Sequence, residues 1–149
     1  MCLFSLVGLG KIMGKIDHLF VESENFVLTI AEGEISDEKF MQHITILNES
    51  EKLTKNYRGI VDCRGVSPVM TPSSETIFKA GHFDKGKSKP RKVAVLADHD
   101  LIYGLVRMYD AYTSHAEMEL FKDLDEAIKW LSVEELSSKI DEFYRNKSV

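Results

Sequence analysis

Apolar and polar residues alternate near the start of the chain in the way that a β-strand with one buried face requires. Phe26, Leu28 and Ile30 occupy every second position, and a period of two residues is the period of a strand. Their stretch runs from Asn25 to Glu32, and a second apolar-rich stretch, Asp17 to Glu22, precedes it. Two such stretches with a short polar connection predict an antiparallel hairpin.

Later apolar runs show little alternation, which is typical of strands covered on both faces. The first is Gly59 to Cys63, and the second is Lys92 to Ala97. A last strand is expected over Glu117 to Lys122. The sheet therefore gains central strands in addition to the hairpin.

Helical spacing of apolar residues, preceded by capping residues, predicts a helix after each strand from the hairpin onwards. A further amphipathic helix is expected at the end of the chain. The expected N-caps are Ser36, Thr71 (before Pro72), Asp98 or Asp100, Asp123 and Ser132. Gly104 lies inside the third helix, where glycine is unfavourable, so a close approach of the backbone to another element is expected there.

The resulting order is β-β-α-β-α-β-α-β-α plus a C-terminal helix, which predicts an α/β layer fold with right-handed crossovers. We divide the chain into an N-terminal extension (1–15), one domain (16–132) and a C-terminal amphipathic helix (133–149). The apolar run near the N-terminus is shorter than the roughly 20 residues that a transmembrane helix needs, so no transmembrane segment is expected.

The chain has 149 residues, of which 44% are hydrophobic and 29% are charged, and its net charge is -5. This is enough chain for one sizeable core. An acidic protein lacks the positive field that binds phosphates, so nucleic acid is not an expected partner. The two cysteines, Cys2 and Cys63, provide neither a disulfide framework nor a zinc-site spacing, which favours a cytoplasmic location.

Three blocks of the sequence together resemble a known family. They are Lys92-Val-Ala-Val-Leu-Ala97, Tyr103-Gly-Leu-Val-Arg-Met-Tyr109 and Leu120-Phe-Lys-Asp-Leu-Asp-Glu-Ala-Ile-Lys-Trp-Leu131. In their residues and their order they resemble the bacterial SpoIIAA-like proteins of the STAS superfamily. The resemblance covers about Ile16 to Leu131, and it implies a mixed β-sheet with helices mainly on one side.

The resemblance also implies a function for the start of the second helix. Anti-sigma-factor antagonists of this fold bind a kinase and are switched by phosphorylation of a serine within an Asp-Ser-Ser-Gly-like motif. The corresponding stretch here, Thr71 to Glu75, keeps Ser73 and Ser74 but lacks the aspartate and the glycine. Some proteins of similar fold hold lipids or other apolar ligands.

A ligand or switch is expected where two helices begin at the same end of the sheet. Ligands of open α/β sheets bind beyond the carboxyl ends of the strands, and helix N-termini favour anions. The candidate residues for ligand binding or switching are Thr71, Ser73, Ser74, Asp98, His99, Tyr103 and Arg107. Helix capping explains several of them equally well.

These observations predict a non-enzymatic STAS-like module that recognises a protein partner or a small ligand, either apolar or anionic. No cofactor and no metal site are expected. A homodimer is expected, because the apolar residues between Leu101 and Tyr112 cover more than one narrow stripe. The alternative is a small hydrolase or other ligand-modifying enzyme with its site near the second and third helix N-termini.

Overall fold

The N-terminal hairpin consists of β1 (Lys15–Val21) and β2 (Phe26–Gly33), which pair in antiparallel register. A 3-10 turn, η1 (Glu22–Glu24), joins them, and Asn25 then adopts a left-handed conformation with φ 50°. Asparagine tolerates this conformation better than most residues. Its side chain also accepts a hydrogen bond from the Thr54 amide at 2.7 Å. The predicted hairpin is confirmed. The computed structural model describes residues 14–85 and 89–147.

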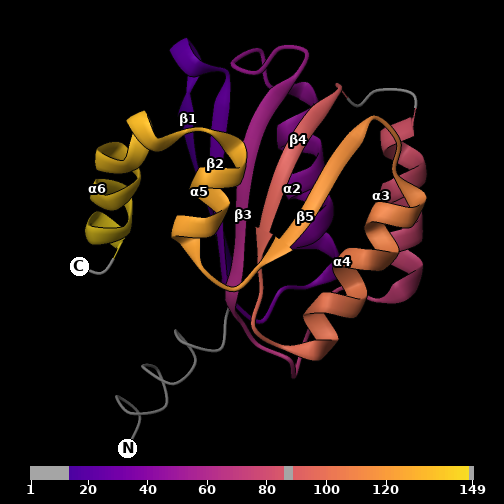
Figure 1. The fold of residues 1–149 in the computed structure, drawn as a ribbon. Helices are drawn as coiled ribbons and strands as arrows, with labels where there is room; N and C mark the ends of the chain where they lie inside the picture. Colours follow the sequence, from indigo (N-terminus) through magenta and orange to yellow (C-terminus); the bar gives the residue numbers. More distant parts are fainter. Residues whose placement is uncertain (1–13, 86–88, 148–149) are drawn as a thin grey trace, which may run out of the picture.

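Three more strands continue the sheet in chain order (Figure 1). They are β3 (Tyr57–Val66), β4 (Arg91–Leu96) and β5 (Ala116–Phe121). The sheet order is β1-β2-β3-β4-β5, and every pair after the hairpin is parallel. The apolar runs expected to form central strands therefore lie in β3 and β4, as predicted.

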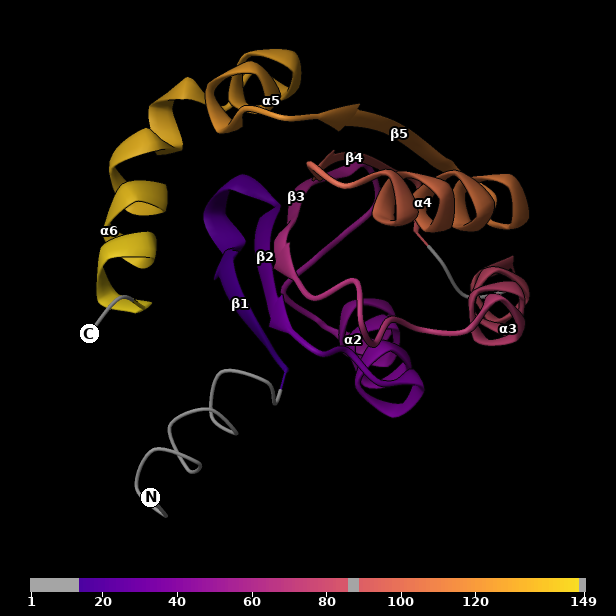
Figure 2. The same ribbon diagram turned by 90° about the horizontal axis from the view of Figure 1, so that it is seen from below.

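Three helices connect the parallel strands: α2 (Asp37–Glu49), α3 (Ser74–Lys85) and α4 (Asp100–Tyr112). Each crossover moves one strand in the same direction, so right-handed connections place all three helices on one face of the sheet. Figure 2 shows these helices together on that face. This arrangement agrees with the predicted α/β fold.

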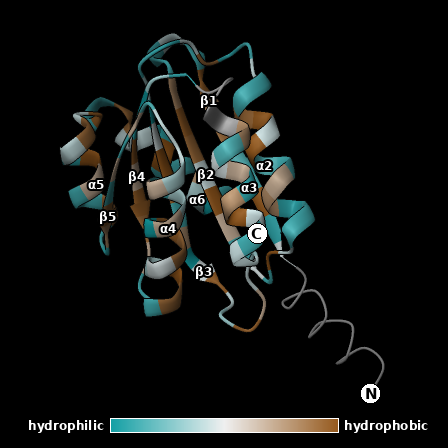
Figure 3. Cartoon of the chain, turned by 90° about the vertical axis from the view of Figure 1, so that its right-hand side faces the viewer, coloured by the Kyte–Doolittle hydropathy of each residue, from teal (hydrophilic) through white to brown (hydrophobic). Residues whose placement is uncertain are grey.

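The opposite face is covered by α5 (Leu124–Leu131), the turn η2 (Glu134–Leu136) and α6 (Ser137–Lys147). A cluster of fully buried side chains joins them to the sheet, including Leu28, Ile60, Leu96, Leu131 and Ile140. The apolar strands lie inside and polar helix faces point outward (Figure 3). Lys147 binds the carboxylates of Asp17 and Glu32, which fastens α6 to the hairpin. No helix among the described residues has both the length and the apolar character needed to cross a bilayer.

Two helix starts differ from the sequence expectation. Thr71 does not cap α3; the hydroxyl of Ser73 accepts the Thr76 amide instead, and the helix begins at Ser74. Neither Asp98 nor Asp100 caps α4, because His99 Nδ1 accepts the Leu101 amide at 3.2 Å. Several neighbouring polar residues can cap a helix, and the sequence alone does not say which adopts the extended cap conformation.

Of the three other predicted caps, two are confirmed and one is wrong. Ser36 and Asp123 cap their helices as expected, accepting the amides of Lys39 and Asp125. Ser132 was expected to open the final helix, but it ends α5 in a left-handed conformation with φ 57°. The last helix begins after a separate turn, η2.

The close backbone approach expected at Gly104 occurs at Gly81. A Cβ atom at Gly104 would meet nothing within 4 Å, whereas one at Gly81 would lie 2.4 Å from Tyr112 Cβ and 3.0 Å from its carbonyl carbon. We therefore expect Gly81→Ala to destabilise the protein by about 1 to 2 kcal/mol through crowding of α3 against α4. The matched variant Gly104→Ala should stabilise it by up to about 1 kcal/mol. Thermal unfolding of both variants checks the pair, and equal effects would contradict it.

Candidate functional site

The start of α3 carries three of the predicted site residues. Thr71 is half-buried, and Ser73 and Ser74 are exposed. The Ser73 amide donates to Asp37 Oδ1 at 2.8 Å, and its hydroxyl donates to Asp37 Oδ2 at 3.3 Å. A carboxylate from α2 therefore already binds at this helix N-terminus, where negative charge is favourable.

The start and middle of α4 carry the other four. Asp98 and His99 are exposed. His99 Nδ1 accepts from the Leu101 amide, so this hydrogen bond stays within α4 and its cap. Tyr103 and Arg107 line an open depression between α4 and β5, beside Asp110 and Glu119. Burial, followed by the charge of Glu119, raises the pKa of Asp110. The predicted residues thus lie at two places, the start of α3, where Ser73 binds Asp37 of α2, and α4, where Tyr103 and Arg107 line the depression beside β5.

A cavity of about 130 Å³ lies between the sheet and helices α2, α3 and α4. Its floor includes three residues from neighbouring strands, Thr29 of β2, Val61 of β3 and Val95 of β4. These three residues are direct partners in the strand register. The floor therefore lies on the three inner strands of the sheet.

The walls of the cavity are apolar side chains from the three covering helices. They include Ile44 of α2, Ile77 of α3, and Ile102 and Leu105 of α4. Phe40 and Tyr109 also line it and contact each other edge to face, with ring centroids 6.0 Å apart. None of the described residues that line the cavity is an aspartate, glutamate, lysine or arginine. The arrangement suits an uncharged molecule.

One polar atom of the floor has no partner among the described residues. The hydroxyl oxygen of Thr29 is fully buried and makes no hydrogen bond there, and the residue as a whole is 1% exposed. Buried hydroxyls usually have a hydrogen-bond partner, because leaving one unpaired costs free energy.

Two histidines meet at the edge of the cavity although they are far apart in the sequence. His18 Nε2 and His43 Nδ1 are 2.9 Å apart, and the rings stack with centroids at 5.1 Å. Burial and the neighbouring His18 lower the pKa of His43 to about 3. Burial also lowers the pKa of His18, although Asp17 opposes the shift. Both rings are therefore neutral at pH 7.

Cys63 lines the cavity from β3. Burial, together with the charge of Asp62, raises the pKa of its thiol to about 12. A thiolate nucleophile needs a lowered pKa. Cys63 therefore remains a protonated thiol at neutral pH and acts as an apolar part of the wall.

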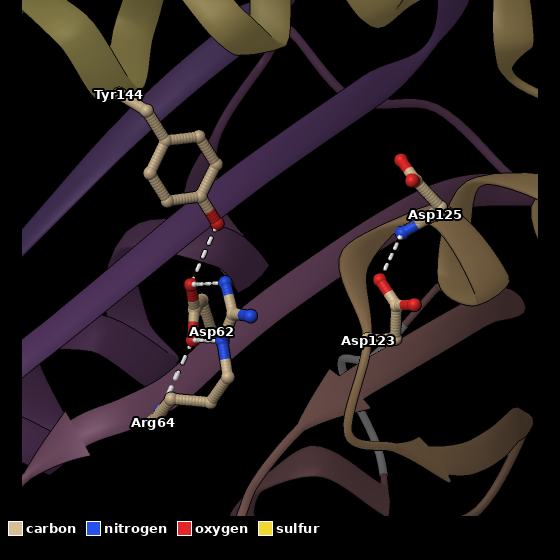
Figure 4. Close-up of polar contacts among 5 residues, drawn as sticks. All are labelled: Asp62, Arg64, Asp123, Asp125 and Tyr144. Atoms are coloured by element: carbon tan, nitrogen blue, oxygen red, sulfur yellow. Dashed lines mark hydrogen bonds and ion pairs between the residues drawn. The ribbon is translucent and has the colours of Figure 1, made fainter.

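A polar cluster, defined by Asp62, Arg64 and Tyr144, lies on the opposite face of the sheet (Figure 4). Arg64 donates to both carboxylate oxygens of Asp62 at 3.0 and 2.9 Å, and the Tyr144 hydroxyl donates at 2.6 Å. Burial raises the pKa of Asp62, but these hydrogen bonds outweigh it, so the pKa lies below its usual value. The cluster binds α6 to the sheet.

The sheet has one antiparallel and three parallel pairings, and in the described part of the chain α2, α3 and α4 cover one face and α5 and α6 the other, which is the architecture of an α/β protein with a mixed sheet. The SpoIIAA-like family model matches residues 27–132, and the chain belongs to this family. No curated protein matches the chain.

Among solved structures, the chain is similar to an uncharacterised protein of the DUF3478 family with a SpoIIAA-like fold from Shewanella loihica PV-4. The two share 20% sequence identity, with a TM-score of 0.56, over 80% of this chain and 95% of the other. At this identity the likeness concerns the fold.

The cavity and its polar residues were not among the sequence-predicted site residues. Thr29 is the one polar residue in the apolar stretch from Phe26 to Ile30 of β2, and this interruption was a signal available in the sequence. Asp62 likewise interrupts an apolar strand run. The sequence positions of His18 and His43 do not indicate that the two side chains are in contact. Among the described residues no group of histidine, cysteine or acidic side chains is arranged to bind a metal.

Proposed function

We propose that the protein is a non-enzymatic binding module that holds a small apolar molecule in the cavity between the sheet and helices α2 to α4. The observation that carries this proposal is the cavity itself, about 130 Å³ in volume and lined by uncharged side chains. An engineered cavity of roughly 150 Å³ with an aliphatic and aromatic lining binds benzene in another protein. A single ring is therefore a suitable size of ligand.

The electrostatic state of the cavity supports binding over catalysis. Covalent or acid–base catalysis at pH 7 uses a nucleophile with a lowered pKa and a base with a pKa near neutrality. The pKa of Cys63 is raised and not lowered, and the pKa of His43, about 3, lies far below neutrality. These shifts argue against catalysis by Cys63 and His43 in the cavity.

Filling the cavity floor tests the proposal. Val61 is the middle residue of the floor row, so Val61→Phe should occupy the space that a ligand ring would take. We expect toluene to bind the wild type in a calorimetric titration and to show no measurable binding to Val61→Phe. Val69→Phe serves as the matched control, because Val69 is 83% exposed in a loop, and it should bind toluene like the wild type. Equal binding by all three proteins would contradict the proposal.

Self-association through α4 and the C-terminal segment is a second part of the proposal. Leu101 at the start of α4 is 43% exposed, which supports a contact surface there. Large exposed apolar patches often mark such surfaces. Light scattering distinguishes a dimer from a particle of 17.0 kDa.

The serines at the start of α3 remain candidates for recognition of a protein partner. Ser73 and Ser74 are exposed, as a phosphorylation switch requires. A phosphate on Ser73 would lie beside the Asp37 carboxylate, so it would compete with the hydrogen bonds that Asp37 now accepts. This competition supports a change of the contact between α2 and α3 on modification.

A further inference from the structure

Strand β5 forms one edge of the sheet (Figure 1). On its inner side, amides of β4 and of the residue after β4 donate to the carbonyl oxygens of His115 and Phe121. These two acceptors are an even number of residues apart, so every second residue of β5 directs its polar backbone groups to β4. No strand of the described chain pairs with the other side of β5. The residues that direct their backbone groups to this open side are Ala116, Met118 and Leu120.

The open depression between α4 and β5 lies beside this edge. Its lining includes three carboxylates, those of Asp100, Asp110 and Glu119, and Arg107 is the one cation among the described residues that line it. Gly104 also lines the depression, and a Cβ atom there would meet nothing within 4 Å. The depression is therefore accessible above α4 and carries a net negative charge.

The charge of this edge argues against pairing with a second copy of the chain. The charged residues of β5 are Glu117 and Glu119, and both are exposed. Two β5 strands paired with each other would bring the glutamates of both copies into one small contact, and like charges on facing strands are destabilising. Burial raises the pKa of Asp110, and the charge of Glu119 raises it further. A positively charged segment matches this edge better than a second β5.

We propose that the open side of β5 binds an extended segment of a partner protein that carries lysine or arginine at alternate positions. The segment adds a strand to the sheet, and its basic side chains lie toward the acidic depression beside α4. In this kind of recognition main-chain hydrogen bonds provide affinity, and alternate side chains provide specificity. The site does not depend on a ligand in the apolar cavity, because none of the carboxylates of the depression lines that cavity.

The test uses the peptide acetyl-Lys-Val-Lys-Val-Lys-Val-amide, which is titrated into the protein at low ionic strength and followed by backbone amide NMR signals. We expect saturable shifts of the amide signals of Ala116, Met118 and Leu120. Two control peptides separate charge from strand pairing. One has glutamate in place of each lysine, and the other is methylated on every backbone nitrogen, so that it keeps its charge but cannot donate. Neither control peptide should cause saturable shifts.

Variants of the protein test the same two features. Leu120→Pro removes one backbone donor on the open side, where an edge strand tolerates proline, and Leu120→Ala is its matched control because it keeps that donor. We expect Leu120→Pro to bind the lysine peptide about fivefold more weakly than Leu120→Ala, the value of one net hydrogen bond. The double variant Asp110→Asn/Glu119→Gln should weaken binding by a similar factor. Thermal unfolding checks that each variant is folded, and the methylated peptide tests the donors in the unaltered protein.

Three outcomes would overturn the proposal. The first is the absence of saturable shifts with the lysine peptide. The second is equal binding of the methylated or the glutamate peptide, which would exclude strand pairing or charge recognition, respectively. The third is a wild-type dimer in analytical ultracentrifugation that becomes a monomer in Leu120→Pro and remains a dimer in Leu120→Ala, which would identify a second copy as the occupant of the edge. Saturable binding of the lysine peptide alone, weakened in Leu120→Pro and in the double variant, supports it.

Discussion

Replacing Arg64 by alanine should lower the free energy of unfolding by about 3 kcal/mol, because it removes one partner of a buried ion pair. Asp62 is 5% exposed, and both of its carboxylate oxygens accept from the guanidinium. After the substitution the donors that remain to Asp62 among residues 14–85 and 89–147 are the Tyr144 hydroxyl and the backbone amide of residue 64. The Arg64 side chain is 33% exposed, which places the expected loss at the low end of the range for buried pairs.

Urea unfolding at pH 7 measures this loss. Arg107→Ala is the matched control, because Arg107 is exposed on α4, and it should change stability by less than about 0.5 kcal/mol. The double variant Arg64→Ala/Asp62→Asn should be less destabilised than Arg64→Ala alone, since it leaves no buried charge. A loss below about 1 kcal/mol in Arg64→Ala would contradict a buried ion pair and would place Asp62 and Arg64 with exposed pairs.

Acidification should destabilise the protein through the histidine pair. The pKa of His43 is about 3 in the folded protein against 6.5 for an ordinary histidine, so below pH 6.5 the unfolded chain binds a proton that the folded protein does not. The contribution of His43 to the free energy of unfolding is therefore fully present above pH 6.5, and it declines as the pH falls toward 3. One such group costs about 2 to 3 kcal/mol between pH 7 and pH 4.5. The lowered pKa of His18 acts in the same direction.

Urea unfolding at several pH values between 7.5 and 4.5 checks this dependence. The double variant His18→Phe/His43→Leu should show a flatter profile over that window, whatever its stability at pH 7. His115→Asn is the control: His115 is exposed and has a φ of 66°, which asparagine tolerates. Its profile should follow that of the wild type. A wild-type profile without a decline above pH 4.5 would contradict a neutral buried pair.

The sheet could be predicted from the sequence because its signals are local. The alternation of Phe26, Leu28 and Ile30 and the apolar runs of β3 and β4 are visible within a few residues. The starts of α3 and α4 were less predictable, because three neighbouring polar residues can cap each of these two helices. His99 capped α4 in place of the aspartates on either side of it.

The cavity could not be predicted in this way, because it depends on register between strands that are distant in the sequence. Thr29, Val61 and Val95 become neighbours only when β2, β3 and β4 pair. The residues that sequence analysis favoured, such as Ser73 and His99, lie at helix N-termini, which leave a recognisable local pattern. A cavity lined by apolar side chains leaves no motif in the sequence.

Soaking a crystal of the protein with bromobenzene and recording anomalous diffraction at the bromine edge tests most directly whether the cavity binds a small ring. We expect a bromine peak between the sheet and helices α2 to α4, over the row of Thr29, Val61 and Val95. A data set with no peak in the cavity, or with one only at the exposed apolar loop of Val69 and Met70, would contradict the account.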